Sequence, residues 1–318
     1  MANELAFDYS GLILVGAVWG LAFVAVKQAD LELSPVNLAL LRWLIVSALF
    51  LPLLLLIGKP KTAFERKDVP RLLLMAFAMV PGYNLSLNSA EVSISAGLSG
   101  LLIAFAPVLI VILSVSLLGE EAGLNVLVAL LLAVSGAFVL SIGSINFNDF
   151  SSVYGPGEVI ISACCYALFS VLGKPLVQKY GAGPTTIRVG LLGTAMLLPL
   201  PSGSFVNQVE SLSLAGWFAV LFLSTAVTVL GYILFFMLVS RRAVSRVSIQ
   251  LYLVPVVSVA GGALLLHEPV TIQMIIGGGM MLGAVALATG TKRALNRFPE
   301  TNTESSTRRA ASAAETTR

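Results

Sequence analysis

The chain has 318 residues, of which 57% are hydrophobic and only 11% are charged, and its mean hydropathy is +0.94. Soluble domains carry about 25% charged residues, so this composition excludes an ordinary soluble protein and predicts an all-α integral membrane protein. The formal net charge of +3 reflects how basic residues are distributed across a membrane, and we expect no nucleic-acid partner.

Ten apolar segments follow one another along the chain, most of them near the length of about 20 residues that crosses a bilayer as a helix. They cover residues 11–29, 35–57, 70–90, 93–118, 123–142, 154–177, 184–200, 212–239, 244–266 and 270–289. The first segment follows Glu4 and Asp8 without the basic region of a signal peptide, so we expect it to remain in the protein. The connections are short, and the sequence has neither a phosphate-binding glycine loop nor a dinucleotide-binding motif. We therefore expect ten transmembrane helices and no cofactor.

The pattern of segments occurs twice in the chain, and corresponding positions are about 148 residues apart. The matching positions are Pro35 and Pro184, Pro52 and Pro201, Gly82-Tyr83 and Gly231-Tyr232, Pro107 and Pro255, and Glu120 and Glu268. Each unit has five segments, an odd number, so the second unit enters the membrane upside down relative to the first. The sequence thus predicts two inverted five-helix repeats, residues 1–148 and 149–291, followed by a disordered cytoplasmic tail at residues 292–318.

The distribution of lysine and arginine predicts the orientation, because these residues accumulate on the cytoplasmic side of membrane proteins. With both termini in the cytoplasm, all but two of the 19 basic residues lie on that side. The two exceptions are Lys27 and Arg42. We expect a multi-pass protein of the cell (inner) membrane.

Arg42 lies inside the second segment, roughly 10 Å from its start at about 1.5 Å per residue. An arginine at a helix centre costs about 2.5–3.5 kcal/mol on insertion scales, so an intramembrane cation is a candidate for function. Two interpretations stay open. Arg42 either reaches to the interface or ties down a neighbouring helix end, or it faces a cavity and attracts an anionic group such as an amino acid carboxylate.

Asn84, Asn88 and Glu91 recur at i, i+4 and i+7 in the third segment, which places them on one helical face. That face cannot be exposed to lipid, because unpaired polar side chains are costly in an apolar medium. It either bonds adjacent helices together or lines a solute cavity. For proton coupling, which needs a carboxylate or histidine deep in a cavity, only Glu91 and more weakly Glu158 could serve, so the sequence gives no firm support for proton-driven transport.

Aromatic side chains complete the predicted site. Trp19 and Tyr166 occupy related places in the two repeats and can stack on a flat or apolar solute, although packing between helices is the alternative for each. The predicted substrate-binding residues are Trp19, Phe23, Arg42, Tyr83, Asn84, Asn88, Tyr166, Tyr232, Ser248 and Tyr252. Pro107 and Pro255 lie mid-segment and are the predicted hinges, because an internal proline removes a backbone hydrogen bond and kinks a helix. We expect no catalytic residue and no metal site.

The chain resembles the EamA-type members of the drug/metabolite transporter superfamily over about residues 11 to 290. The resemblance rests on short motifs in a fixed order: Trp19-Gly20-Leu21-Ala22-Phe23, Leu40-Leu41-Arg42-Trp43, Leu118-Gly119-Glu120 and His267-Glu268-Pro269. It implies a ten-helix carrier that exports amino acids or other small metabolites through a central cavity, with both termini cytoplasmic.

Four functions were compared. The first is an alternating-access exporter of amino acids or related metabolites, with a small molecule and the lipid bilayer as partners. The second is a carrier of phosphorylated or nucleotide sugars, which needs several cavity cations where Arg42 stands alone. An intramembrane enzyme would need clustered acids, bases or metal ligands, and none is visible. The fourth is a structural or lipid-handling membrane protein without a solute site.

The predicted orientation is tested by labelling single cysteines at positions 61 and 208. An impermeant maleimide added to intact cells should label Gln208→Cys and leave Lys61→Cys unlabelled until the membrane is opened, because the loop with Lys61 is strongly basic. Labelling of position 61 from outside intact cells would overturn the orientation.

Overall fold

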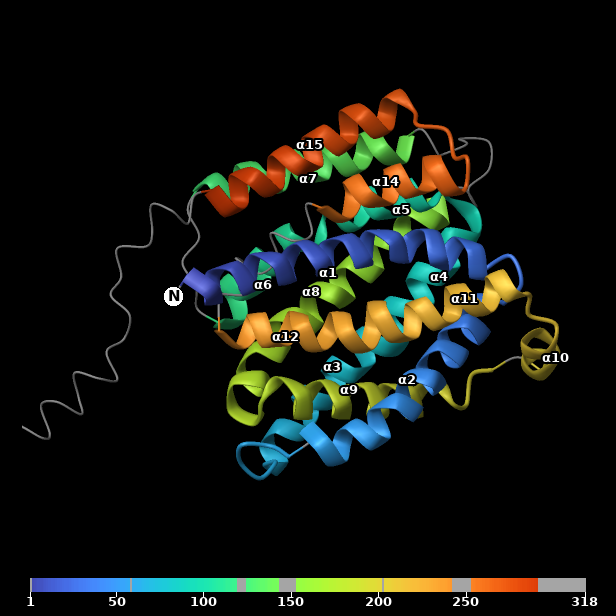
Figure 1. Ribbon diagram of the computed structural model, residues 1–318. Coiled ribbons are helices and arrows are strands. Elements are labelled where there is room, and N and C mark those ends of the chain that lie inside the picture. The colour runs from blue at the N-terminus through green and yellow to red at the C-terminus, as the bar shows by residue number, and fades with distance from the viewer. Residues whose placement is uncertain are drawn as a thin grey trace, which may run out of the picture.

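The computed structural model describes residues 2–57, 59–118, 124–142, 153–201, 203–241 and 253–290, which form an all-helical bundle (Figure 1). The predicted all-α fold is confirmed. The α-helices are α1 Ala2–Ala29, α2 Pro35–Ile57, α3 Val69–Phe77, α4 Asn84–Ser93, α5 Ala96–Ile103, α6 Ala106–Leu118, α7 Leu124–Ile142, α8 Tyr154–Tyr180, α9 Ala182–Leu197, α10 Phe205–Glu210, α11 Leu214–Phe222, α12 Gly231–Arg241, α14 Leu253–Leu265 and α15 Ile272–Gly290. A 3-10 turn, η1, covers Arg66–Asp68, and two π-helical segments cover Ala78–Tyr83 (η2) and Leu223–Leu230 (η4).

All ten predicted apolar segments contain helix, the ninth being described only from Leu253. Among the described residues, four helical stretches are long and apolar enough to cross a membrane: Pro35–Leu56, Ala96–Leu117, Tyr154–Tyr180 and Leu214–Ser240. Large apolar side chains lie on the outside of the bundle, including Leu55, Leu214 and Phe218, each at least 74% exposed. Such a surface suits hydrocarbon and not water. Crossing by all ten segments stays a prediction.

Helices from the two halves of the chain pack against one another in a reciprocal way. α1 contacts η4, α11 and α12, while α8 contacts η2, α3 and α4. The pair α7 and α15 lies at one edge of the bundle, and the pair α2 and α9 lies toward the opposite edge (Figure 1). α1 and α8 therefore occupy the middle, where the first helix of each half meets the third and fourth segments of the other.

The third and eighth segments are each widened by a π-helical turn, η2 and η4. Such turns leave backbone carbonyls poorly bonded and often occur at functional sites. Thr228 Oγ1 donates to the Leu223 carbonyl oxygen at 2.7 Å, and Asn84 Nδ2 donates to the Met79 carbonyl oxygen at 2.8 Å. A polar side chain, Thr228 within η4 and Asn84 directly after η2, thus satisfies the carbonyl five residues back.

The predicted hinge prolines differ in what the structure describes of them. A turn at Ala104 and Phe105 divides the fourth segment into α5 and α6, and Pro107 is the second residue of α6. The kink thus lies just before Pro107, where the Leu109 amide donates to the Phe105 carbonyl oxygen at 3.3 Å. Pro255 is the third residue of α14, and the segment before it is outside the described residues. Hinge motion at either proline stays a prediction.

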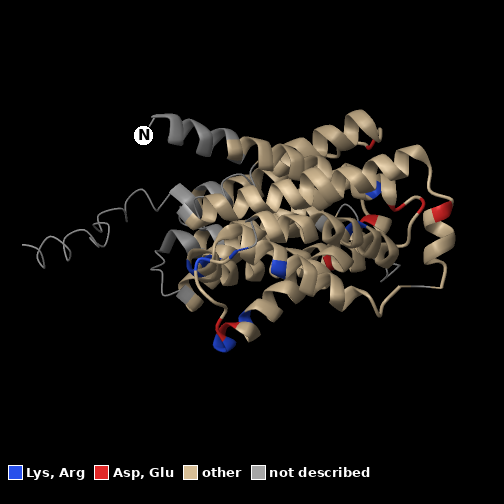
Figure 2. Cartoon of the chain, turned by 60° about the horizontal axis from the view of Figure 1, so that its bottom comes forward, with Lys and Arg blue, Asp and Glu red and all other residues tan. Residues whose placement is uncertain are grey.

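Charged residues gather mostly at the two ends of the bundle (Figure 2). At one end, which we call the Tyr180 end, the loop after α2 is fastened to the end of α8. Lys179 Nζ lies 2.6 Å from Glu65 Oε1 and 2.7 Å from Asp68 Oδ2, and the Tyr180 hydroxyl donates to Asp68 Oδ2 at 2.5 Å. We call these contacts the Lys179 latch. The hydrogen bonds from Lys179 hold the pKa of Glu65 and the pKa of Asp68 below their ordinary values.

The opposite end, the Asp30 end, is closed by contacts between the turn after α1 and the segment around α10. The backbone amide and the hydroxyl of Ser213 both donate to the Glu32 carboxylate at 2.6 Å. Gln208 Oε1 accepts from Asn37 Nδ2 at 2.7 Å and from the Ser34 amide at 3.1 Å. We call these contacts the Ser213 latch. Each latch joins the first half of the chain to the second.

The α7–α15 pair provides a test of helix packing. A Cβ added at Gly277 would lie 2.9 Å from the Gly136 carbonyl oxygen, whereas nothing lies within 4 Å of one added at Gly279. Gly277→Ala should therefore lower the free energy of unfolding by about 1–3 kcal/mol. Gly279→Ala, the matched control, should be neutral or stabilising because alanine favours helix. Thermal unfolding in detergent measures both, and equal effects of the two substitutions would contradict this packing.

The Lys179 latch should weaken in acid. Because the pKa values of Glu65 and Asp68 are lowered in the fold, their contribution is present above their ordinary pKa of about 4 and is lost as pH falls through the lowered value. A spin label on Lys59→Cys should become more mobile between about pH 5 and pH 3. In Lys179→Met the label should be mobile already at neutral pH. A mobility that does not change with pH in the unsubstituted latch would refute the prediction.

Candidate functional site

A small cavity lies in the middle of the bundle, between helices of both halves. Its volume is about 30 Å³, whereas pockets that hold small ligands measure about 300–1,000 Å³. The lining residues are Trp19, Ala22, Phe23, Val26, Arg42, Met79, Tyr83, Leu87, Ile103, Tyr166, Val227, Tyr232 and Val254. The cavity is thus too small for such a ligand in this structure, and its lining must move apart before one can bind. We call this arrangement the closed form.

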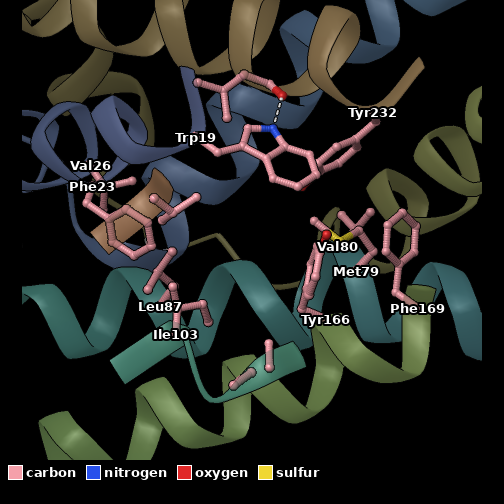
Figure 3. Packing of buried hydrophobic residues seen from close by; sticks show 14 of the residues in the cluster. Trp19, Phe23, Val26, Met79, Val80, Leu87, Ile103, Tyr166, Phe169 and Tyr232 are labelled. Atoms are coloured by element: carbon pink, nitrogen blue, oxygen red, sulfur yellow. Dashed lines mark hydrogen bonds between the residues drawn. The ribbon is translucent and has the colours of Figure 1, made fainter. Parts of the chain in front are cut away.

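Trp19 of α1 is the centre of the aromatic part of the lining (Figure 3). Its indole N–H donates to the Val227 carbonyl oxygen in η4 at 3.0 Å. The rings of Tyr166 and Tyr232 meet the indole edge to face, each with its centroid 5.8 Å away, a geometry favoured by aromatic quadrupoles. Trp19 and Tyr166, the related residues of the two repeats, therefore touch across the middle of the bundle.

The repeated Gly-Tyr pair lets these helices approach. A Cβ on Gly231 would lie 2.5 Å from Trp19 Nε1, and a Cβ on Gly82 would lie 2.8 Å from Cys165 Sγ. Each glycine thus makes room for the first helix of the other half. The tyrosine that follows each glycine, Tyr83 or Tyr232, lines the cavity.

Arg42 is the charged residue of the lining and is only 3% exposed. Its Nε and Nη2 donate to Thr228 Oγ1 at 3.0 and 2.7 Å, and its Nη1 donates to Asn84 Oδ1 at 3.0 Å. A guanidinium has five N–H groups, so two of them, one on each terminal nitrogen, have no acceptor in the described part of the chain. No acidic side chain of the described residues pairs with Arg42.

This arrangement holds a cation in the interior with no counter-ion among the residues that the structure describes. Burying an unpaired charge is costly, and two neutral acceptors offset only part of that cost. A carboxylate fits the remaining N–H groups well because guanidinium binds carboxylates through parallel hydrogen bonds. The aromatic rings beside Arg42 can in turn receive an ammonium group through cation–π contact.

The structure brings together six of the predicted site residues as cavity lining, namely Trp19, Phe23, Arg42, Tyr83, Tyr166 and Tyr232. Asn84 and Asn88 are buried but do not line the cavity in this closed form. Asn84 binds Arg42, whereas Asn88 Nδ2 donates to the Pro35 carbonyl oxygen at 3.1 Å and joins α4 to α2. Ser248 and Tyr252 lie outside the described residues.

Thr228 is the polar residue that sequence reasoning missed. Its hydroxyl accepts two N–H groups of Arg42 and donates within η4. The sequence does mark Thr228 as a candidate site residue, since it is a hydroxyl residue in an apolar segment, three positions before the repeated Gly231. Apolar lining residues such as Met79 and Leu87 give no such signal, because in sequence they look like lipid-facing side chains.

Solved and curated proteins share this architecture. A protein crystal structure that is 20% identical in sequence matches with a TM-score of 0.62, covering 90% of this chain and 99% of that chain, which shows a shared fold. An uncharacterized transporter of Archaeoglobus fulgidus is 32% identical over 271 residues, which are 85% of this chain and 94% of the relative.

Two further relatives carry more specific names. A probable terminal-alkyne amino-acid exporter of Streptantibioticus cattleyicolor is 26% identical, over 92% of this chain and 96% of its own. A probable amino-acid metabolite efflux pump of Escherichia coli is also 26% identical, over 87% of this chain and 91% of its own. The sequence pattern of the EamA-like transporter family matches residues 8–142 and again residues 156–290. The chain therefore belongs to the EamA-like transporter family and is a membrane transporter.

Proposed function

We propose that the protein is an alternating-access exporter of amino acids or related small carboxylates across the inner membrane. Its ten spans form two inverted five-helix repeats, residues 1–148 and 149–291, with both termini in the cytoplasm. The observation that carries the proposal is Arg42, a buried cation that faces a closed aromatic cavity and has no counter-ion among the described residues.

The packing of the two halves supports alternating access. Each half contributes residues of one π-helical turn to the wall of the cavity, and the contacts between halves are reciprocal. The Lys179 latch and the Ser213 latch both join the halves, at opposite ends of the bundle. Rocking of one half against the other would release one latch while the other stays closed, as in carriers built from inverted repeats.

The chemistry of the lining supports a carboxylate with a single negative charge. Arg42 supplies one positive charge, which matches an amino acid carboxylate and falls short of a phosphate ester or nucleotide sugar. An apolar side chain and an ammonium group both suit the rings around Trp19. The names of the relatives from Streptantibioticus cattleyicolor and Escherichia coli, both amino-acid exporters or efflux pumps, point the same way.

Binding of leucine tests the proposal. Leucine should raise the melting temperature of the purified protein, whereas leucinamide, which lacks the carboxylate, should raise it much less. Arg42→Gln should weaken leucine binding about 10- to 100-fold, because a hydrogen bond to a charged group contributes about 1.5–3 kcal/mol. The matched control is Arg71→Gln, since Arg71 is an exposed arginine of α3.

The same variants should be compared for transport in proteoliposomes at equal protein content. Loss of leucine exchange is expected in Arg42→Gln and not in Arg71→Gln. If Arg42→Gln binds and exchanges leucine as the unsubstituted protein does, Arg42 does not hold the carboxylate and the proposed site is wrong.

A further inference from the structure

Two carboxylates are buried without partners at the Asp30 end. Glu91, in the last turn of α4, is 0% exposed, and neither of its carboxylate oxygens has a hydrogen-bond partner within the described ranges. The same holds for both carboxylate oxygens of Asp30, in the turn after α1. These groups take no part in either latch. A buried carboxylate is normally paired or hydrogen-bonded, so two unpartnered ones need an explanation.

The charges around Glu91 do not neutralise it. Asp30, Lys27, Glu268 and Tyr83 are the ionisable groups that act on it. The Lys27 ammonium donates to the backbone carbonyl oxygens of Glu91 and Ile94, the latter at 2.9 Å, and so caps the end of α4 instead of pairing with the carboxylate.

The other elements around α4 add no compensating charge. Glu268 accepts the Ala96 and Gly97 amides at 2.8 and 3.1 Å and so caps the start of α5. The α2 cation, Arg42, binds Asn84 two turns away. α8 also packs on α4, and none of its described residues is among the ionisable groups that act on Glu91.

A proton is the ligand that this pair fits. In the described part of the chain no group of three acidic, histidine or cysteine side chains can hold a metal ion. Burial raises the pKa of Asp30 to about 8, against the opposing effect of Lys27. A proton on the pair removes a negative charge that the interior cannot solvate, and it needs no further ligand.

We infer that Glu91 and Asp30 form a proton-binding site that holds a proton while the Asp30 end is closed and releases it when that end opens. On opening, one carboxyl O–H bond breaks, the carboxylate becomes hydrated, and the proton passes to water on that side of the membrane. Protons therefore favour the closed form. The inference uses the closed and open forms of the proposed transporter, but not the identity of its solute.

The position of the site links proton release to solute access. Glu91 lies on the same face of α4 as Asn84, which binds Arg42, at a distance of about 10 Å along the helix at 1.5 Å per residue. Leu87, one turn before Glu91, lines the cavity. An opening that hydrates Glu91 therefore moves the turn of α4 that covers the cavity.

Infrared spectroscopy of the purified protein tests the site directly, with the proton itself as the probe. At about pH 6, where exposed carboxyl groups are ionised, the protein should show the carbonyl stretch of a protonated carboxyl. Glu91→Gln should weaken this band, and Glu91→Gln combined with Asp30→Asn should abolish it, because Asp30 is also protonated at this pH. The control Glu210→Gln, on exposed α10, should keep the band. Asp30→Asn retains Glu91 and removes the neighbouring carboxylate, whose negative charge favours the protonated form of Glu91. In this variant Glu91 should therefore lose its proton, and the band should disappear, at a lower pH. An absent band, or one unchanged in Glu91→Gln and Asp30→Asn, would overturn the inference.

Distances between two spin labels test whether proton release accompanies opening of the Asp30 end. Labels on Leu31→Cys and Leu265→Cys, both exposed at the Asp30 end, are placed in a protein whose Cys164 and Cys165 are replaced by alanine. The distance should lengthen between about pH 5 and pH 9 and stay short when both carboxylates are replaced, in Glu91→Gln with Asp30→Asn. A pH response that persists in this double variant refutes the site. If the band and the response are present but leucine does not bind, the proposed solute is wrong while the proton site stands.

Discussion

The cavity is arranged around one buried cation, the guanidinium of Arg42, which has no counter-ion among the described residues. Thr228 and Asn84 hold this group through their side-chain oxygens. Thr228 lies in the π-helical turn η4, and Asn84 directly follows the π-helical turn η2. The π-helical turns, the repeated glycines and the packing of Trp19 on η4 can all be understood as the framework that keeps the cation in place.

The repeat explains why one cavity has a polar side and an aromatic side. Gly82 and Gly231 admit the first helix of the opposite half in the same way, yet the second helix carries arginine at position 42 and leucine at the corresponding position 191. The two halves thus share a scaffold and differ in the residues facing the cavity. In the proposed transport cycle, the symmetry of the halves would give the motion two equivalent ends, and Arg42, present in one half alone, would give the solute one orientation.

The helical content and the meeting of Trp19 with Tyr166 follow from patterns that a sequence displays, namely apolar length and internal repetition. The partner of Asn88 does not, because its bond to the Pro35 carbonyl oxygen depends on how α4 lies against α2. Periodicity put Asn84, Asn88 and Glu91 on one face, but three different environments follow along that face: a cation, a backbone carbonyl and an unpartnered carboxylate pair. Tertiary packing determines which environment each of the three residues has. The contact of Thr228 with Arg42 could not be predicted from the sequence, because it depends on the π-helical turn η4.

The most direct measurement is a solid-state NMR distance between the carboxyl carbon of ¹³C-labelled leucine and the guanidinium nitrogens of ¹⁵N-arginine in the membrane-embedded protein. Direct hydrogen bonding to Arg42 predicts strong dipolar dephasing at a carbon-to-nitrogen separation of about 4 Å or less, and loss of that dephasing in Arg42→Gln. Bound leucine without dephasing, or dephasing that persists in Arg42→Gln, would contradict a carboxylate held by Arg42.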